Sequence, residues 1–163
     1  MTRSRRLAAL LYGTAAATYL VDRVSKLWVE QALSGREAVQ VIPGFLRFTY
    51  TTNSGGAFGL GQSAPLLFAG ATLLVSVFIV VTSFRLPRPL VAVALGLVLG
   101  GALGNLTDRV VRGPGLSGRV IDFIDLRVWP VFNLADSAVV IGAILLAIAS
   151  LQKPRDEERT GAG

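Results

Sequence analysis

The residues of this chain best suited to chemistry are aspartates and asparagines that recur at helical spacing. Asn105 and Asp108 are three residues apart, as are Asn133 and Asp136, so each pair would share one face of a helix. Two carboxylates that lie close together can share one proton, so that one activates water while the other acts as an acid. Asp122 and Asp136 are candidates for such a pair, because the short segment between them can turn back onto the following helix.

The chain contains no cysteine and no histidine, which removes most other catalytic groups. Disulfides, thiol nucleophiles, Cys or His metal sites and Ser-His-Asp triads are therefore excluded. Any chemistry must come from Asp, Glu, Lys, Arg, Ser, Thr, Tyr or Asn.

Three other kinds of function remain open from the residues alone. A Ser/Lys peptidase would use Ser25 and Lys26, but adjacent side chains point apart on a helix. A Mg²⁺-dependent lipid phosphotransferase would need several carboxylates as ligands, although no tight acidic repeat is present. Its candidate ligands are Asp108, Asp122, Asp125 and Asp136. A transporter or channel subunit would need polar groups along a path across a membrane.

The elements that must position these residues are strongly apolar. Of 163 residues, 52% are hydrophobic, and the mean hydropathy is +0.60. A small soluble domain cannot bury that much apolar surface, so the excess is expected to face lipid. Four stretches approach the roughly 20 residues that cross a bilayer as a helix. These predicted transmembrane helices are about 7–33, 65–84, 90–106 and 131–151.

The first stretch also resembles a cleaved secretory signal, because arginines precede a short apolar run that ends in Ala15-Ala16-Ala17. Amphipathic sequence continues through Asp22 and Lys26 to Trp28, a typical interfacial anchor. We therefore expect one uncleaved helix that reaches the membrane interface.

Counting along the helices places the polar residues at one depth. Asp22 and Asn105 each lie roughly 22 Å along their predicted spans, at 1.5 Å per residue, near the outer end. The fourth span runs in the opposite direction, so Asn133 and Asp136 lie in its first two turns and are also outer. Ionisable residues inside a membrane are costly and are functional candidates by default, and this shared level indicates a site.

Two segments outside the spans are expected to be extended. Val39–Ile42 and Phe45–Thr52 flank Pro43-Gly44, a turn dipeptide, which predicts a small hairpin. Val120–Ile124 is expected to be another short extended piece.

Loop arginines indicate the orientation. Arg85 and Arg88 lie in the tight link between the second and third spans, with no acidic partner in that link, and short basic loops remain in the cytoplasm. Basic residues near both ends of the chain share that side, so both termini are predicted to be cytoplasmic. The net charge of +6 is assigned to lipid headgroups and not to nucleic acid, because no basic stripe interleaved with aromatics is present.

Five motifs in order resemble the bacterial lipoprotein signal peptidases, also called signal peptidase II. They are Asp22-Arg-Val-Ser-Lys26, Asn53-Ser-Gly-Gly-Ala-Phe58, Gly100-Gly-Ala-Leu-Gly-Asn105-Leu-Thr-Asp-Arg109, Val120-Ile-Asp-Phe-Ile124 and Phe132-Asn-Leu-Ala-Asp136. Arg23 stands where a Gln is frequent in that family and Gly56 where an Ala is frequent. Each motif alone is weak, but the ordered set covers the chain from its first span to its last.

The resemblance implies an all-α polytopic membrane protein with four transmembrane helices and a small extracytoplasmic β-sheet. It implies an aspartic endopeptidase without cofactor or metal, which cuts a prolipoprotein just before a cysteine that carries diacylglycerol. Asp122 and Asp136 map to the catalytic pair. The supporting or substrate-contacting positions map to Asp22, Lys26, Asn53, Asn105, Asp108, Arg109 and Asn133.

Residues 1–152 are expected to form a single membrane peptidase domain, followed by a disordered cytoplasmic tail at 153–163. The enzyme is expected to work as a monomer among membrane lipids, in the bacterial cytoplasmic membrane, with its active site on the extracytoplasmic face. The apolar wall near Phe58 and the third and fourth helices would hold the acyl chains of the substrate.

Overall fold

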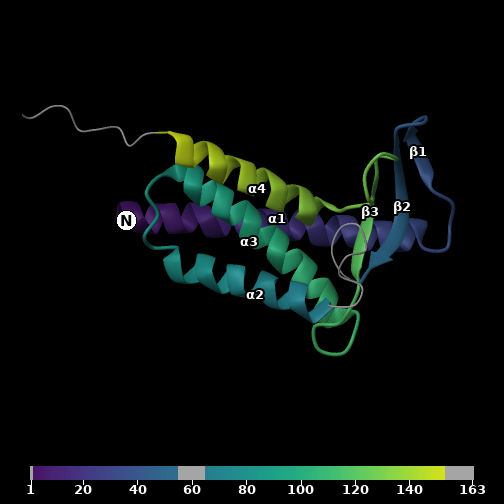
Figure 1. Ribbon diagram of the computed structural model, residues 1–163, viewed down its shortest axis with the longest axis horizontal. Helices are drawn as coiled ribbons and strands as arrows, with labels where there is room; N and C mark the ends of the chain where they lie inside the picture. Colours follow the sequence, from purple (N-terminus) through teal and green to yellow (C-terminus); the bar gives the residue numbers. More distant parts are fainter. Residues whose placement is uncertain (1, 55–64, 153–163) are drawn as a thin grey trace, which may run out of the picture.

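A computed structural model of the chain describes residues 2–54 and 65–152. Four helices lie side by side, and a small sheet covers one end of them (Figure 1). Phe58 and the 153–163 tail lie outside the described residues.

The longest element is α1, Arg3–Leu33, a single helix of 31 residues. The side chain of Thr2 caps its first turn by accepting from the backbone N–H of Arg5, so the helix begins four residues before the predicted position. Ala15-Ala16-Ala17 lie within this continuous helix, and Ala15 is buried. The face that α1 turns inward carries Leu7 and Leu11 near the N-terminus and the charged residues Asp22 and Lys26 further along.

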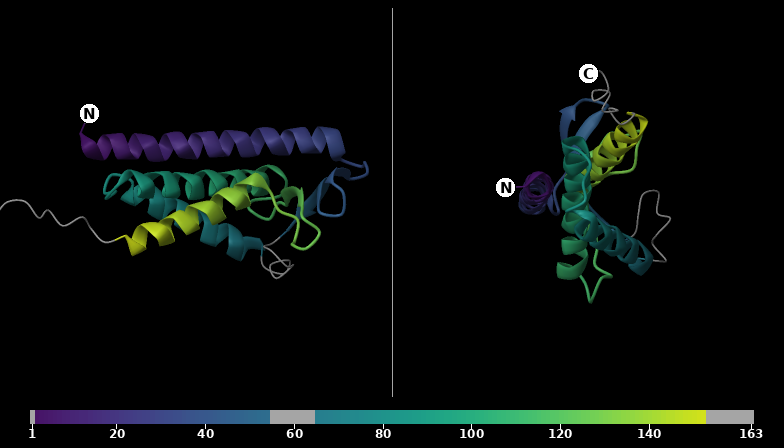
Figure 2. Two further views of the ribbon diagram at one scale, coloured as in Figure 1. Left: turned by 90° about the horizontal axis from the view of Figure 1, so that it is seen from above. Right: turned by 90° about the vertical axis from the view of Figure 1, so that its left-hand side faces the viewer.

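The other helices are α2, Pro65–Thr82, α3, Pro89–Val111, and α4, Leu134–Leu151. Helix α3 is central: α1 packs on one side of it and α4 on another, while α2 contacts it less extensively (Figure 2). Among the described residues, α3 and α4 are long and apolar enough to cross a membrane by length and composition. The apolar part of α2, Leu66–Thr82, is shorter.

Glycines allow α3 to lie so close to its neighbours. A Cβ at Gly100 would lie 2.5 Å from the carbonyl oxygen of Ala15 on α1. A Cβ at Gly101 would collide with the carbonyl oxygen of Ala135 on α4. Gly100 and Gly101 therefore bring α3 into close contact with two helices at once.

Three further helix boundaries differ from those predicted by two residues or more. Helix α3 continues to Val111 and not to 106, because Asp108 and Arg109 are buried within it and do not mark a solvent-exposed end. Helix α4 begins at Leu134 and not at 131, because Phe132 pairs with Ile124 as an isolated bridge. Helix α2 ends at Thr82, two residues before the predicted end.

The sheet is antiparallel, with strands β1, Val39–Ile42, β2, Leu46–Asn53, and β3, Val120–Asp125, in the order β1-β2-β3. The predicted hairpin is present, and Gly44 turns it with a positive φ of 77°, which glycine adopts without strain. The register pairs Thr51 with Asp122 and Asn53 with Val120. Strand β3 is largely buried, so the sheet holds Asp122 against the ends of the helices.

Candidate active site

A buried ion cluster joins α1 to α3 near the sheet. Asp22 and Lys26 are four residues apart on α1, so both point toward α3. Lys26 Nζ lies 2.9 Å from Asp22 Oδ2 and 3.0 Å from Asp108 Oδ2, and all three side chains are fully buried. Arg23 forms a second ion pair with Asp108 through Oδ1.

Each aspartate of this cluster also binds a backbone N–H of another element. Asp22 Oδ1 accepts from the N–H of Ala135 at 3.0 Å, in the first turn of α4. Asp108 Oδ2 accepts from the N–H of Ile121 on β3 at 3.3 Å. The cluster therefore fixes α1, α3, α4 and β3 relative to one another.

Asn133 and Asp136 form a capping box at the N-terminus of α4. Asn133 Oδ1 accepts from the N–H of Asp136 at 2.9 Å, and Asp136 Oδ2 accepts from the N–H of Asn133 at 3.2 Å. Asn133 is thus the N-cap of α4. The sequence had instead predicted that Asn133 lies within the first turns of this helix. The two hydrogen bonds of this capping box orient the side chains of both Asn133 and Asp136.

The free amide group of Asn133 bridges to the other aspartate. Asn133 Nδ2 donates to Asp122 Oδ1 at 2.7 Å and also to the carbonyl oxygen of Ile121 at 3.2 Å. The other carboxylate oxygen of Asp122 accepts from Asn53 Nδ2 at 3.1 Å. Strand pairing and helix capping therefore bring Asp122 and Asp136 into one hydrogen-bonded group.

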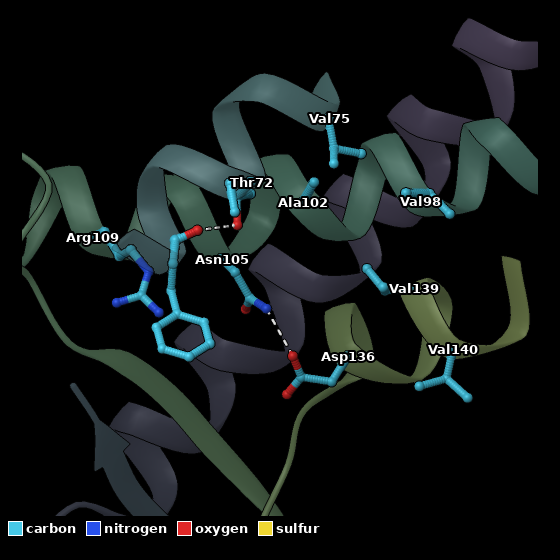
Figure 3. Close-up of a pocket in the computed structure, with 11 residues that line it drawn as sticks. Thr72, Val75, Val98, Ala102, Asn105, Arg109, Asp136, Val139 and Val140 are labelled. Carbon is cyan, nitrogen blue, oxygen red and sulfur yellow. Dashed lines mark hydrogen bonds between the residues drawn. The ribbon is translucent and has the colours of Figure 1, made fainter. Parts of the chain in front are cut away.

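Asn105 on α3 holds Asp136 from the opposite side. Its Nδ2 donates to Asp136 Oδ1 at 2.8 Å, as drawn in Figure 3. Its Oδ1 accepts from Lys26 Nζ at 2.8 Å and from Asn133 Nδ2 at 3.2 Å. Asn105 is therefore the link between the buried ion cluster and the two aspartates.

Asp122 is electrostatically different from an ordinary carboxyl group. Burial and, after it, the negative charge of Asp136 raise the pKa of Asp122 to about 7. Hydrogen bonds from Asn53 and Asn133 and the charge of Lys26 oppose this rise without cancelling it. A group with this pKa holds a proton near neutral pH, as the acid of an aspartate pair must.

A pocket of about 390 Å³ opens between α2, α3 and α4 and ends at Asp136. Its polar lining consists chiefly of Asn105, Arg109 and Asp136, which lie together at one end (Figure 3). The rest is mainly apolar and includes Phe68, Val75, Val98, Ala102, Val139 and Val140. A polar centre with an apolar extension suits a substrate that combines a peptide bond with a long hydrocarbon group.

Arg109 reaches this pocket from α3 but does not bind either aspartate in the structure. Its guanidinium donates to the carbonyl oxygens of Ser54 at 3.3 Å and Gly118 at 3.5 Å. It is almost completely buried. Arg109 therefore ties the end of β2 and the segment before β3 to α3, beside the pocket.

The structure brings the other eight predicted site residues into one continuous network and places Arg109 at its edge. Sequence reasoning did not predict the ion pair between Arg23 and Asp108, although the place of Arg23 beside Asp22 and its positive charge were visible signals. It also missed Arg112, which binds Glu30 through two parallel contacts of 2.5 and 2.7 Å.

The structure gives less support to a Ser/Lys peptidase and to a Mg²⁺-dependent phosphotransferase. Ser25 Oγ donates to the carbonyl oxygen of Asp22 in its own helix, and Lys26 points into the ion cluster. Asp125 binds Arg47 and lies apart from the network, and within residues 2–54 and 65–152 no three Asp or Glu side chains gather as a metal site would require.

Comparisons with known proteins all indicate the same family of enzymes. A family profile described as Signal peptidase (SPase) II matches residues 14–152. The "Lipoprotein signal peptidase" of Streptomyces coelicolor is 46% identical over 156 residues, which cover 93% of this chain and 74% of the relative. That of Syntrophomonas wolfei is 46% identical over 149 residues, which cover 91% and 97%.

A solved structure described as a "Bacterial membrane enzyme structure by the in meso method at 2.3 A resolution" resembles the whole fold. It superposes with a TM-score of 0.75 at 30% identity and covers 92% of each chain. The arrangement of helices and sheet is therefore that of a known membrane enzyme.

Proposed function

The chain belongs to the signal peptidase II family of aspartic peptidases, which cleave the signal peptides of lipoproteins, and we propose that Asp122 and Asp136 are its catalytic pair. One observation carries this assignment. Asn133 caps Asp136 and at the same time donates to Asp122 at 2.7 Å, so both carboxylates are held together at the end of an apolar pocket.

The two aspartates take different roles. Asp136 accepts hydrogen bonds from the side-chain amide of Asn105 and from the backbone N–H of Asn133, which hold both of its carboxyl oxygens in place. It acts as the base that draws a proton from water, and the oxygen of that water bonds to the scissile carbonyl carbon. Asp122, with a pKa of about 7, carries the proton that stabilises the developing oxyanion.

Proton transfers then complete the reaction. As the C–N bond breaks, the leaving amine takes the proton that Asp136 gained from water. The carbonyl forms again and becomes the new carboxyl end of the signal peptide, and Asp122 recovers its proton. Two carboxylates and one water balance this hydrolysis, so no metal or cofactor is required.

The substrate is a prolipoprotein whose cysteine already carries diacylglycerol, and cleavage falls just before that cysteine. The pocket between α2, α3 and α4 supports this proposal, because its apolar walls lead away from Asp136 along the helices. Hydrocarbon can stay there in contact with lipid while the peptide bond lies beside the aspartates.

All four helices span the membrane, and residues 1–152 act as one domain and as a monomer. Large apolar side chains support the place of α2 in the membrane, since Leu67, Leu74 and Val81 are 70–72% exposed, a costly arrangement in water. Trp28 and Trp129, both more than half exposed, lie near the sheet, where aromatic residues mark a membrane interface.

Both termini face the cytoplasm of a bacterial cell, and the sheet and active site face outward across the cytoplasmic membrane. Arginines support this orientation, because Arg85 and Arg88 lie in the link between α2 and α3, and Figure 1 shows this link at the end of the helices opposite the sheet. Arg3 joins them there and donates to the carbonyl oxygen of Pro87 at 2.8 Å.

The catalytic pair is tested with Asp122→Asn and Asp136→Asn in detergent-purified enzyme and a diacylglyceryl-modified prolipoprotein. Each change is expected to lower kcat by about 10³-fold or more, the scale on which essential catalytic groups act. Asp125→Asn is the matched control on the same strand, because Asp125 binds Arg47, and it is expected to keep nearly full activity. Full cleavage by Asp122→Asn or by Asp136→Asn would show that these two residues are not the catalytic pair. Dialysis against EDTA is expected to leave cleavage intact.

A further inference from the structure

A fully buried lysine lies behind the aspartate pair without touching it. Lys26 Nζ donates to Asn105 Oδ1 at 2.8 Å and forms ion pairs with Asp22 Oδ2 at 2.9 Å and Asp108 Oδ2 at 3.0 Å. We propose that Lys26 is a positioning residue that fixes which way the amide of Asn105 points and thereby holds Asp136 in its reactive geometry. The inference rests on the proposed role of Asp136 as a catalytic residue.

The amide of Asn105 has one accepting and one donating end, so its orientation decides what Asp136 meets. Two donors, Lys26 Nζ at 2.8 Å and Asn133 Nδ2 at 3.2 Å, converge on one end of this amide. Only an oxygen satisfies both, because a lysine ammonium has donors and no acceptor. The NH₂ group must therefore face Asp136, to which it donates at 2.8 Å.

A reversed amide would be unfavourable at both ends. Its NH₂ group would face the ammonium of Lys26, donor against donor, and its oxygen would face the carboxylate of Asp136, acceptor against acceptor. Without Lys26, only the longer 3.2 Å contact from Asn133 would oppose that reversal. Lys26 is thus the stronger of two groups that keep the amide in place.

The position of Lys26 itself is fixed by its ion pairs. Asn105 Oδ1 accepts a hydrogen bond from Lys26 Nζ, whereas Asp22 Oδ2 and Asp108 Oδ2 face the same nitrogen as ion-pair partners. Two acidic side chains, Asp22 and Asp108, lie beside Lys26, and Arg23 pairs with Asp108 as a second basic residue. Arg112 also lies 3.5 Å from Asp108, but its own acidic partner is Glu30, so acidic and basic side chains are equal in number in the cluster. Lys26 is fully buried and does not line the pocket beside Asp136, so it acts on the reaction through Asn105 and not by contact with the substrate.

Arg23 provides a matched control for the loss of a cation beside Asp108. Both Arg23 and Lys26 form ion pairs with Asp108, but only Lys26 donates to Asn105. Arg23→Gln removes one such pair and leaves the orientation of the Asn105 amide unchanged. If charge pairing with Asp108 were the whole role of Lys26, both substitutions would have similar effects.

The primary test uses Lys26→Met combined with Asp22→Asn, which keeps acidic and basic side chains equal in number and leaves the Arg23–Asp108 pair in place. With folded enzyme quantified by size-exclusion chromatography, we expect kcat on a diacylglyceryl-modified prolipoprotein to fall about 10- to 100-fold, the range for groups that orient reacting side chains. KM is expected to change less than twofold, because Lys26 does not line the pocket. Arg23→Gln is expected to keep kcat within about threefold of the parent.

A double-mutant cycle separates orientation from general structural damage. In an Asn105→Ala background, where no amide remains to orient, the Lys26→Met/Asp22→Asn change is expected to lower kcat by less than threefold. An equal fold-loss in both backgrounds, or a loss in Arg23→Gln that matches it, would overturn the proposal. Failure of Lys26→Met to fold, both alone and with Asp22→Asn, would also overturn it by making the role of Lys26 structural.

The outcome is distinguishable from failure of the proposed function. If Asp136→Asn cleaves normally, the catalytic assignment is wrong whatever Lys26 does. If Asp136→Asn is inactive while the cycle is additive, only the inference about Lys26 fails.

Discussion

At the scale of single residues, Asp122 occupies a position where two influences raise its pKa. It lies on a buried strand, and the second influence is the charge of Asp136. Because the pKa is raised to about 7, the proton is present below neutral pH and is lost above it. The proposed acid of the pair is therefore switched off on the alkaline side.

We expect kcat to fall as the pH rises through about 7 and to lose roughly tenfold per pH unit beyond it. The measurement is cleavage of a lipid-modified prolipoprotein from pH 5 to 9, with thermal unfolding at each pH as the control for folding. Asn53→Ala removes a hydrogen bond that lowers the pKa of Asp122, so its alkaline limb is expected to lie at higher pH. A flat profile up to pH 9 would contradict the assigned role of Asp122.

Asn133 combines a structural role with a role in the site, and two substitutions separate them. Asn133→Ala loses both the N-cap and the amide that binds Asp122, whereas Asn133→Ser keeps a good N-cap and loses only the amide. We expect the alanine variant to be less stable than the serine variant by about 1 kcal/mol. Both are expected to lose at least about 10²-fold in kcat. Thermal unfolding and cleavage assays measure the two effects, and an active serine variant would show that the amide is dispensable.

The sequence predicted which residues form this site better than it predicted the contacts that they make. The absence of Cys and His and the shared depth of the aspartates and asparagines indicated carboxylate chemistry. The family resemblance was needed to choose Asp122 and Asp136 from the other acids. The capping role of Asn133 was missed, because spacing alone does not distinguish an N-cap from a first-turn residue, and the true start of α4 depends on the Phe132–Ile124 bridge.

At the scale of elements, the close approach of α3 and α4 positions Asn105 against Asp136. Gly101 lies at this contact, and a methyl group there would meet the carbonyl of Ala135 and, at 3.0 Å, the side chain of Val139. Both neighbours lie within the first turns of α4. Any widening of this contact would lengthen the hydrogen bond from Asn105 to Asp136.

We expect Gly101→Ala to cost about 1–3 kcal/mol of stability through overpacking and to lower kcat at least tenfold. Gly13→Ala on α1 is the control, because nothing lies within 4 Å of its added Cβ. That control is expected to be neutral or up to about 1 kcal/mol more stable, since alanine favours helix over glycine. Equal stability and activity in the two variants would show that the α3–α4 approach is not tight.

The positions of elements were predicted well where neighbouring residues determine them, and less well where contacts with distant buried residues determine them. The hairpin follows from Pro43-Gly44 between runs of strand formers, and Gly44 turns it as expected. The end of α3 was placed too early, because Asp108 and Arg109 looked like residues beyond a membrane span. Their partners, Lys26 and the carbonyl of Gly118, lie far away or in a loop, and sequence spacing does not reveal such contacts.

At the scale of the whole molecule, charge and polarity are divided between two ends. The aspartates, asparagines and Lys26 of the site gather where the helices meet β3. Arg85 and Arg88 lie in the link between α2 and α3, which Figure 1 shows at the opposite end. Between these ends, α2 and α4 expose apolar side chains such as Leu74 and Val140. This division is what a bilayer selects in a protein that works on one of its faces.

The proposed orientation can be tested directly, because the chain contains no cysteine and any introduced thiol is unique. Val41 on the hairpin is 47% exposed, and Pro87 in the link between α2 and α3 is also exposed, so cysteine is tolerated at both. We expect a membrane-impermeant maleimide to label Val41→Cys in intact spheroplasts and to label Pro87→Cys only after detergent is added. The physical reason is that moving the link outward would carry Arg85 and Arg88 across the hydrocarbon, which costs roughly 2.5–3.5 kcal/mol for each arginine at its centre. Labelling of Pro87→Cys in intact spheroplasts would reverse the orientation and move the aspartate pair to the cytoplasmic face, where a translocated prolipoprotein could not reach it.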